Sequence, residues 1–555
     1  MHGALCSFST TWKRQSHATA PQHQPERKQI AILGGGITGL TAAYYASKRF
    51  PDATITLFES THRLGGVIDS VHTDVGNGSM VCDTGPRTLR ANAPRAFVTL
   101  DLIRTLNLTA RLHPIPRTYP AASTRFLLSP HHPTPTLLRL PTGGAHLLPT
   151  SLPPLSALLN PLAHHRSPLA SLPSLARTLL PALLHDALLA PPRPRSLADE
   201  SVLAFATRRW GPRAAADLAA AVVQGVWAGE AGRLSARACL AGMWAAEGGL
   251  VGGRGWGGVV GRMVRGVEGG EAEEGEGRFL RGLWEARRVG EGVGVGGLSV
   301  YTFKGGMGAL TAAVEGEVRR RGNVGVVTGA VVTGVGAREG GVEVTVGGVA
   351  REFTHVVAAT PVNHFISAAK LSLSTMQEAT VMVVTLCYQK SRLNCPYHGF
   401  GYLVPPSVPR SLNPEQAIGV VFDSDALAGQ DSSSGTKITV IIGGGYWAGL
   451  KEYPSKEEGT AMAKRVLERH LGLRDEPVAA VATLQRDAIP QYEVGYFERM
   501  KELRQELLTR FGGRVRVAGK CYAGIGVHDC IFSGRMVAER LDEEGLTGLE
   551  QFEKG

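Results

Sequence analysis

The chain has 555 residues, of which 43% are hydrophobic and 19% charged, so a fibrous or wholly disordered protein is excluded and two or three domains with large cores are expected. Its seven cysteines are scattered without CxxC spacing, which argues against a disulfide framework or a structural zinc site and fits a reducing compartment. The formal net charge of +11 favours an anionic partner such as a nucleic acid, a membrane surface or an acidic substrate.

The N-terminal segment, residues 1–28, is unlike the rest of the chain. It contains serines, threonines and basic residues, no acid before Glu26 and no long apolar run. This composition resembles a mitochondrial transit peptide more than a secretory signal, and a disordered tail is the alternative.

A glycine-rich turn follows at residues 34–39, between a short apolar run (IAIL) and a stretch with helical spacing. In a dinucleotide-binding fingerprint Gly34 allows the tight turn, Gly36 lets the backbone approach a pyrophosphate, and Gly39 lets helix and strand pack closely. Glu59 ends a second apolar run 20 residues after Gly39, where an acid can bind a ribose diol. A glycine turn that holds no nucleotide is the alternative.

The residues after Glu59 indicate which dinucleotide is bound. In ESTHRLGG, Arg63 and the pair Gly65 and Gly66 place a cation and small residues where they can lie along a diphosphate. This extended pattern is typical of the flavin side of the dinucleotide-binding families. We therefore expect FAD rather than NAD.

Residues 102–198 carry nine arginines and a single acid, Asp186, among many leucines and prolines. Short apolar helices beside arginines suit the headgroup layer of an anionic membrane, where each basic residue contributes about 1 kcal/mol. No apolar run reaches the roughly 18 residues of a spanning helix. The alternative is an apolar core with a basic rim; aromatic residues are too sparse to favour nucleic acid.

Residues 102–247 are expected to be mainly helical, with one helix beginning near Ser196, three residues before Asp199. Residues 248–297 are rich in glycine with mixed charge and are expected to form an insertion of low order.

The C-terminal half alternates between strand-like and helical patterns. Residues 298–360 contain an amphipathic helix and strand-like runs that could complete the nucleotide-binding sheet, and TVMVVTLCYQ, AIGVVFDS and TKITVIIGGG predict an antiparallel sheet. Near the end, Gly524 and Gly526 allow a flat ring to approach the start of a helix, whose dipole would stabilise the negative charge of a reduced flavin. An ordinary strand-to-helix turn is the alternative.

These motifs together resemble the oxygen-dependent protoporphyrinogen oxidase family, over about residues 29–542. The resemblance rests on GGGITGL (34–40), ESTHRLGG (59–66), TGPRTLR (84–90), TRFLL (124–128), GVWAGE (225–230), GFGYLVP (399–405), GVVFDS (419–424), IPQY (489–492) and AGKCYAGIGVHDC (518–530). The first two and the last are shared with amine oxidases and carotene desaturases, and the middle ones are specific.

The resemblance, with the fingerprint, implies residues for each site. FAD, held noncovalently, would contact Gly34, Gly35, Gly36, Ile37, Thr38, Gly39, Glu59, Ser60, Arg63, Gly66, Val67, Gly85, Pro86, Arg87, Thr88, Val332, Ala518, Gly519, Ile525, Gly526 and Val527. Arg125 would face a substrate propionate and Gly229 would lie beside the tetrapyrrole; without the resemblance Arg125 reads as one more basic surface residue. No metal site and no catalytic acid or base is expected, because the flavin carries the redox chemistry.

Two positions along the C-terminal motif, His528 and the pair Lys520 and Cys521, depart from the family pattern. His528 stands where relatives often carry Asn, which could change a backbone contact but is not expected to make this residue a base. Lys520 and Cys521 replace smaller residues near the flavin.

The sequence thus predicts an α/β fold, α+β overall. A Rossmann-like FAD-binding domain is built from residues 29–101, 298–360 and 481–542, an antiparallel-sheet substrate domain from 361–480, and a mainly helical membrane-associating region from 102–247, with a tail at 543–555. The implied activity is oxidation of protoporphyrinogen IX by O2, with release of H2O2, on the mitochondrial inner membrane as a peripheral protein. Homodimerisation and contact with the terminal ferrochelatase are expectations from the family alone.

Two other functions remain open at this point. One is another enzyme of the amine oxidase or carotene desaturase branch, which would not need a carboxylate-binding Arg125. The other is a membrane scaffold that keeps FAD for structure. Reduction of the bound flavin by protoporphyrinogen without oxygen would separate all three.

Overall fold

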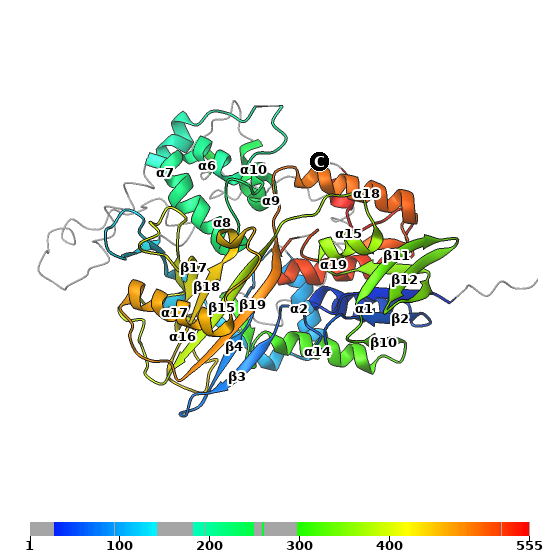
Figure 1. Ribbon diagram of the computed structural model, residues 1–555, viewed down its shortest axis with the longest axis horizontal. Helices are drawn as coiled ribbons and strands as arrows, with labels where there is room; N and C mark the ends of the chain where they lie inside the picture. Colours follow the sequence, from blue (N-terminus) through cyan, green and yellow to red (C-terminus); the bar gives the residue numbers. More distant parts are fainter. Residues whose placement is uncertain are drawn as a thin grey trace, which may run out of the picture.

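The computed structural model describes residues 27–140 except 94, 181–248 except 195, 258–259, and 297–553 except 523. Nearly all of the expected transit peptide and glycine-rich insertion lies outside these residues. Figure 1 shows two sheets side by side, with a group of helices at one end of the molecule.

A five-stranded parallel sheet is assembled from three distant parts of the chain, in the order β10-β2-β1-β14-β20. Its strands are β1 (Gln29–Leu33), β2 (Thr54–Phe58), β10 (Val324–Val327), β14 (His355–Ala358) and β20 (Val515–Val517). The expected Rossmann-like sheet, completed by a strand after residue 298, is confirmed. Sequence neighbours β1 and β2 pair in parallel because α1 (Ile37–Arg49) crosses between them.

Helices and a small sheet cover the two faces of the parallel sheet. Ile30 and Ile32 of β1 pack into one core with α1, α14 (Gly308–Arg320) and α19 (Val527–Glu539), and Ala31 and Leu33 pack into the other. The second core contains β11 (Val332–Arg338), β12 (Gly341–Val346), β13 (Val349–Phe353), α15 (Val362–Ala369) and α18 (Tyr496–Phe511). Because successive side chains of a strand point to opposite faces, a strand buried on both faces reads as a continuous apolar run.

The second large sheet has seven strands in the order β19-β15-β18-β17-β16-β7-β8. They are β7 (Arg125–Leu128), β8 (Leu137–Leu140), β15 (Glu378–Tyr388), β16 (Gly401–Leu403), β17 (Ala417–Val421), β18 (Thr436–Gly443) and β19 (Ala479–Pro490). All neighbours are antiparallel except β16 and β7. Helix α17 (Lys456–Leu471) packs on one face through Ala463, Val466 and Leu467.

Two predictions about this sheet were wrong. Residues 102–140 were expected to be mainly helical, yet they contain β7 and the edge strand β8 of this sheet, and β6 (Leu112–Pro116) of a smaller one. Residues 481–490 were assigned to the FAD-binding part, yet β19 pairs with β15 of the antiparallel sheet. Strands β7 and β8 pair with each other, but their short, leucine-rich segments have no periodicity that separates strand from helix. The partners of β6 and β19, in contrast, lie far away in sequence, so local spacing carries no signal of them.

Shorter strands and helices connect the two sheets. The hairpin β3 (Ser70–Asp74) and β4 (Ser79–Asp83) and the sheet β5-β9-β6, with β5 (Leu89–Arg90) and β9 (Leu298–Phe303), lie between them. The remaining short elements here are η1 (Thr109–Arg111), α2 (Ala96–Thr105), α3 (Pro120–Ser123), α16 (Asp423–Ala426), η7 (Gly444–Trp447) and η8 (Glu550–Phe552).

Residues 181–248 form the helical group at the end of the molecule (Figure 1). It contains η3 (His185–Leu189), α6 (Val202–Trp210), α7 (Pro212–Ala214), η4 (Ala215–Ala219), α8 (Ala220–Trp227), α9 (Ala236–Cys239) and α10 (Ala241–Gly248). The helix expected near Ser196 begins instead after Ser201, whose hydroxyl accepts from the Ala204 amide. Within the described residues, no helix is long and apolar enough to cross a membrane.

Charged side chains inside this helical group are paired. The Arg209 guanidinium is fully buried and lies 2.5 Å from the Asp186 carboxylate, which is itself fully buried. Asp186, the single acid of residues 102–198, therefore neutralises a buried cation and is not available to a partner.

Candidate functional site

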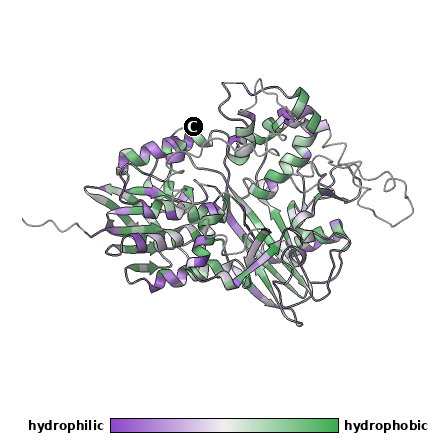
Figure 2. Cartoon of the chain, turned by 180° about the vertical axis from the view of Figure 1, so that it is seen from behind, coloured by the Kyte–Doolittle hydropathy of each residue, from purple (hydrophilic) through white to green (hydrophobic). Residues whose placement is uncertain are grey.

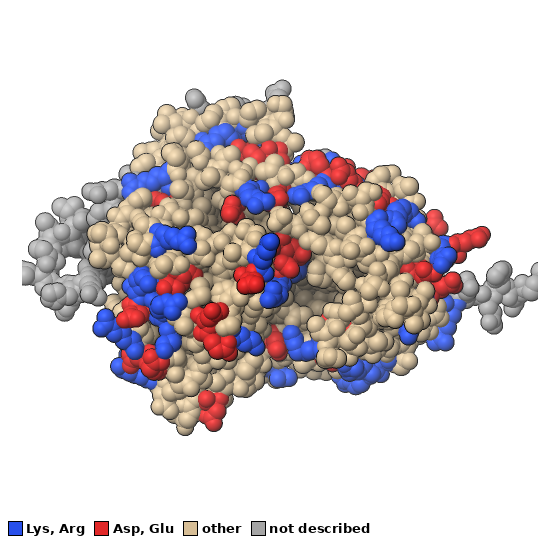
Figure 3. Space-filling view, in the orientation of Figure 1, with Lys and Arg blue, Asp and Glu red and all other residues tan. Residues whose placement is uncertain are grey.

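A cavity of about 1050 Å³ lies between the parallel and the antiparallel sheets. Figure 3 shows a hollow between these two halves, with both acidic and basic side chains at its edge. A pocket for one small ligand occupies about 300–1000 Å³. This cavity therefore lies at the upper end of that range, which suits a large ligand such as a dinucleotide.

The glycine-rich turn between β1 and α1 forms one wall. Gly34 has φ +99°, a conformation that favours glycine, and a Cβ on Gly39 would lie 1.8 Å from the Gly34 carbonyl oxygen. Gly36 differs from both: its φ is −68° and a Cβ there would find only the Gly66 Cα, at 4.0 Å. Neither the backbone nor the protein's own packing requires glycine at position 36, so the open space in front of it suits a ligand.

Glu59 is held in place at the end of β2. Its Oε2 accepts from the Gly35 amide at 2.7 Å and its Oε1 from the Thr61 amide at 2.8 Å. The side chain is 9% exposed and lines the cavity. Backbone amides thus fix a carboxylate beside the turn, in the position that binding of a ribose diol needs.

The loop after Glu59 contains one difference from expectation. Gly65, Gly66 and Val67 line the cavity, but Arg63 does not. The Arg63 guanidinium donates instead to the Leu64, Gly66 and Ile68 carbonyls of its own loop. These bonds let Arg63 shape the loop, and its contact with the diphosphate stays a prediction.

The segment 85–88 lies between the two sheets. Gly85, Pro86 and Arg87 line the cavity, whereas Thr88 does not. The Arg87 Nε lies 3.1 Å from the Asp423 Oδ1, and both side chains are largely buried. This ion pair ties the segment to the antiparallel sheet.

The C-terminal loop closes the cavity at the start of α19. Ala518, Gly519, Ile525 and Val527 line it, and Gly526 is the N-cap of the helix without lining it. Helix α19 therefore directs its N-terminal amides and positive dipole end toward the cavity, which suits the negative charge of a reduced flavin.

His528 follows this loop, but its side chain does not line the cavity. Its Nδ1 is 2.7 Å from the Thr99 Oγ1 and its Nε2 is 3.0 Å from the Arg90 carbonyl oxygen. Burial lowers the pKa of this imidazole. With both ring nitrogens engaged, His528 links α19 to α2 and β5 and is not placed as a base.

Apolar side chains of the antiparallel sheet form the opposite wall. Val381 and Val383 of β15, Ile418 of β17, Ile441 of β18 and Ile489 of β19 all line the cavity. A flat apolar substrate can therefore lie between this wall and the dinucleotide-binding side. Val332, the residue expected from β11, also lines the cavity, as do Gly34, Ile37, Thr38 and Ser60.

Neither residue predicted for the substrate lies in the cavity wall. Arg125 is half-buried on β7, donates to the Ala122 carbonyl at 3.1 Å and lies over the Phe400 ring, 5.2 Å from its centroid. A Cβ on Gly229 would lie 1.9 Å from the Gln491 Oε1, so glycine is required there for packing. The neighbours Gly225, Val226 and Ala228 line the cavity instead.

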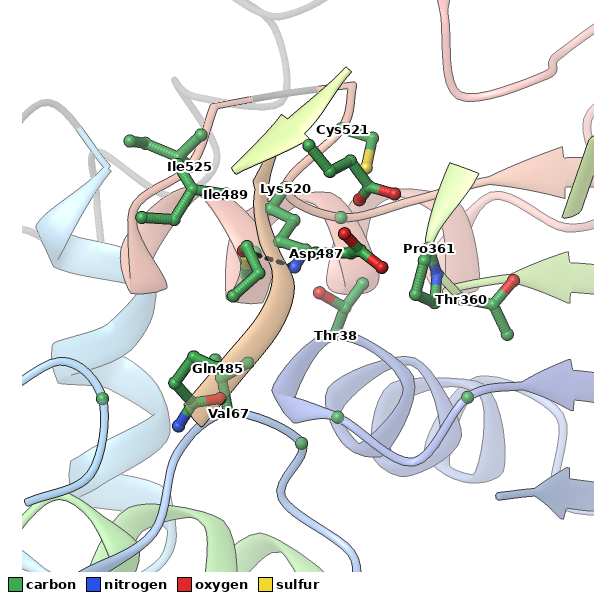
Figure 4. Close-up of a pocket in the computed structure, with 18 of the residues that line it drawn as sticks. Thr38, Val67, Thr360, Pro361, Gln485, Asp487, Ile489, Lys520, Cys521 and Ile525 are labelled. Atoms are coloured by element: carbon green, nitrogen blue, oxygen red, sulfur yellow. Dashed lines mark hydrogen bonds between the residues drawn. The ribbon is translucent and has the colours of Figure 1, made fainter. Parts of the chain in front are cut away.

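Several polar cavity residues were not predicted from sequence. Glu378, Asp487, Gln485 and Asn363 line the cavity together with Lys520. Figure 4 shows Asp487 and Lys520 facing the same space as Thr38 of α1. They come from four separate elements, so no local motif joins them; the one signal in the sequence is the charge of Lys520 beside the glycine loop.

The residues in place fit a flavin dinucleotide. An open path in front of Gly36, a fixed carboxylate at Glu59 and a helix start at Gly526 provide for the pyrophosphate, the ribose and the ring system respectively.

Comparisons with known proteins agree with this geometry. Residues 37–542 match the model of the family described as flavin containing amine oxidoreductase. The chain is 31% identical over 524 residues to human protoporphyrinogen oxidase, covering 92% of this chain and 98% of that one. It is 28% identical over 522 residues to protoporphyrinogen oxidase of Schizosaccharomyces pombe, with the same coverage. A crystal structure of a proposed protoporphyrinogen oxidase from Exiguobacterium sp. 255-15 superposes with a TM-score of 0.66 at 20% identity, covering 93% of this chain and 98% of that one.

Proposed function

Because the chain belongs to the protoporphyrinogen oxidase family of flavin-containing amine oxidoreductases, we propose that it oxidises protoporphyrinogen IX to protoporphyrin IX with FAD and O2. The human and Schizosaccharomyces pombe relatives are matched over 98% of their length. The activity is that of an FAD-dependent oxidoreductase of haem biosynthesis.

One observation carries this assignment in the structure: a single cavity combines a dinucleotide wall with an apolar wall. The first wall contains Gly36, Glu59 and the start of α19, and the second contains Val381 and Val383. Protoporphyrinogen is a largely apolar macrocycle, so the second wall offers it a matching surface beside the flavin.

The chain's own residues would bind and orient the two molecules. FAD, when bound, accepts the electrons of the substrate and passes them to O2. Gly36 and the N-terminal amides of α1 would hold its pyrophosphate, and the Glu59 carboxylate its ribose. The apolar side chains of β15, β17 and β18 exclude water and hold the macrocycle against the ring, which is the positioning part of the catalysis.

We also propose that the enzyme is a peripheral protein of the mitochondrial inner membrane. Exposed apolar side chains gather on the helical group: Leu188 is 61% and Leu189 67% exposed, and Val222 and Val226 of α8 are 46% and 55% exposed. Val226 also lines the cavity. An apolar surface that continues into the cavity would let a lipid-dissolved substrate enter without crossing water. Figure 2 shows the same helices with many hydrophobic residues.

The test is reduction of the bound flavin without oxygen. Anaerobic protoporphyrinogen IX should bleach the visible absorbance of the holoenzyme, and admission of O2 should restore it with release of three H2O2 per protoporphyrin formed. Primary amines and carotene precursors should leave the absorbance unchanged. Bleaching by an amine and not by the porphyrinogen would place the enzyme in the amine oxidase branch, and bleaching by none of them would favour a structural flavin.

A further inference from the structure

Four polar residues meet at one side of the cavity. Glu378 begins β15, Asn363 lies in the first turn of α15, Asp487 is on β19, and Lys520 follows β20. All four line the same cavity as the dinucleotide wall. Figure 4 shows Lys520 and Asp487 on the cavity side of β19.

Hydrogen bonds fix this group from both sides. The Asn363 Nδ2 donates to the Glu378 Oε2 at 3.1 Å and to the Met376 carbonyl at 2.7 Å. The Lys520 ammonium donates to the Ala488 carbonyl at 2.5 Å. Glu378 and Lys520 are therefore held by different elements and face a common space.

A bulge in β19 brings Asp487 to the cavity wall that also contains Glu378 and Lys520. The pairing of β15 with β19 shifts register between Ala379 and Val381, and Asp487 has φ +44°. The Asp487 amide donates to the Thr380 Oγ1 at 3.0 Å across this irregularity. Bulges of this kind redirect a side chain and are frequent beside active sites.

Glu378 has an oxygen that its own surroundings do not use. Its Oε1 is buried and, among the described residues, has no hydrogen-bond partner. A buried polar atom without a partner costs about 1–3 kcal/mol, so a structural role alone would favour an apolar residue here. An unpaired buried oxygen favours the neutral form of the carboxyl, so Glu378, whose side chain lines the cavity, can take up a proton there.

We propose that Glu378 is the proton acceptor of this cavity, taking the proton that the macrocycle loses beside each hydride during oxidation and returning it when O2 is reduced. The inference rests on the proposed function. In each two-electron step a C–H bond would give up two electrons and one proton to the flavin, and the macrocycle would give up one further proton to Glu378. Over the three steps, two of these further protons leave pyrrole nitrogens and the third leaves the fourth bridging carbon, which accounts for the six hydrogens lost. O2 then takes both electrons and both protons and leaves as H2O2, so each cycle restores the carboxylate.

Burial and the charges around Glu378 set the pKa of its carboxyl. Burial raises the pKa of the Glu378 carboxyl to about 7, Lys520 opposes this rise, and Asp487 adds to it. The other groups that face it are the Asn363 amide, which stabilises the carboxylate, and the Cys521 and Tyr522 side chains, whose pKa values are raised by their own burial. A carboxyl with a pKa near 7 can both accept and release a proton near neutral pH.

The decisive experiment measures the protonation of the Glu378 carboxyl by infrared spectroscopy, with no substrate present. The bound flavin is photoreduced in the wild-type holoenzyme at pH 8, and infrared difference spectra are recorded in H2O and D2O. The negative charge of the reduced flavin raises the pKa of a nearby carboxyl, so a protonated-carboxyl band sensitive to D2O should appear on reduction. The band should be absent from Glu378→Gln, which keeps the size and the Asn363 contact, and present in the control Glu339→Gln, at an exposed turn.

Two further variants keep the proposal open to refutation if Glu378→Gln does not bind FAD. Lys520→Met removes a cation and should move the pH midpoint of the band upward, whereas Asp487→Asn removes an anion and should move it downward. The rate of anaerobic flavin reduction by protoporphyrinogen should rise with pH as the carboxyl ionises beside the oxidised flavin, with a midpoint below that of the infrared band. The two charge variants should move this midpoint in the same directions as they move the band, and Glu378→Gln should lose the dependence.

The outcomes separate cleanly. A band that persists in Glu378→Gln, or midpoints that move in the same direction or not at all in the two charge variants, would overturn the role of Glu378. The infrared measurement uses no porphyrinogen, so its result does not depend on whether porphyrinogen reduces the flavin. If porphyrinogen does not reduce the flavin, the proposed function is refuted, whatever the infrared band shows.

Discussion

Arg125 lies half-buried on β7, and among the described residues no carboxylate pairs with it. Burial lowers the pKa of its guanidinium, and the nearby Arg90 lowers it further. Two cations that repel each other and lack an anion form a site that a carboxylate ligand would stabilise. The family resemblance assigns a propionate to Arg125, and this positive potential supports that prediction, although the side chain does not line the cavity in this conformation.

The Arg125 prediction can be tested with substrate esters. Arg125→Ala should raise KM and lower kcat while FAD content is unchanged, because a lost guanidinium–carboxylate contact is equivalent to about 1.5–3 kcal/mol and also fixes which carbon faces the flavin. Arg125→Lys should be milder, since it keeps the charge but loses the bidentate geometry. Steady-state kinetics with free and esterified porphyrinogen measure this.

The Arg125→Ala variant is the control for the effect of esterifying the substrate. Esterification should lower wild-type activity toward that of Arg125→Ala and change the Ala variant little. An equal loss in both enzymes would mean that another residue binds the propionate.

At the scale of elements, Gly36 and Gly39 of the β1–α1 turn have different roles. A Cβ on Gly39 would collide with the Gly34 carbonyl, while a Cβ on Gly36 would enter open space. Gly39 therefore serves the packing of helix on strand, and Gly36 serves the ligand. The distinction is visible only with coordinates, because the sequence pattern treats both positions alike.

Substitutions at the two positions should fail differently. Gly36→Val should leave the unfolding midpoint of the apoprotein nearly unchanged but abolish the yellow holoenzyme, because its branched side chain fills the pyrophosphate path. Gly39→Ala should lower the free energy of unfolding of the apoprotein by about 1–3 kcal/mol through overpacking. Absorbance at the flavin bands and denaturant unfolding of the FAD-free proteins measure the two effects. A Gly36→Val protein with stoichiometric FAD would contradict the fingerprint assignment.

Local patterns predicted the elements whose partners are close in sequence or whose faces are uniformly buried. The β1, α1 and β2 unit and the strands β15, β17 and β18 are of this kind, because continuous apolar runs identify strands buried on both faces. The strands β7 and β8 were missed, since short, leucine-rich segments have no periodicity that separates strand from helix. Likewise the Glu378 site depends on a bulge in β19, which no spacing rule reveals.

At the scale of the whole molecule, the most exposed leucines among the described residues, Leu188 and Leu189, lie on the helical group at one end. The exposed leucines of η3 and valines of α8 lie on the helical group, away from the parallel sheet (Figures 1 and 2). Of the arginine-rich and leucine-rich stretch 102–198 that was expected to contact the membrane, residues 141–180, with Arg166 and Arg177, lie outside the described residues.

Liposome binding tests the membrane proposal. The holoenzyme should bind vesicles that contain anionic lipid, and binding should weaken as salt rises from 0.05 to about 0.5 M, because the Debye length falls well below roughly 10 Å. Co-sedimentation over a salt series measures this. Leu188→Ser with Leu189→Ser should weaken the part of binding that salt does not remove, while Val331→Ser, an exposed apolar residue of the parallel-sheet half, should not. Binding that is equal for neutral and anionic vesicles would contradict the electrostatic part.

The parallel sheet has a consequence for how the enzyme is made. Its strand order places β20, from the last part of the chain, at the edge beside β14, and the loop after it supplies the helix start at Gly526. A ribosome adds about 5–20 residues per second, so tens of seconds pass between synthesis of the first glycine turn and synthesis of β20 and α19. Cofactor insertion must therefore come after synthesis of nearly the whole chain, and during that interval β1 and β2 offer an unpaired apolar sheet to chaperones.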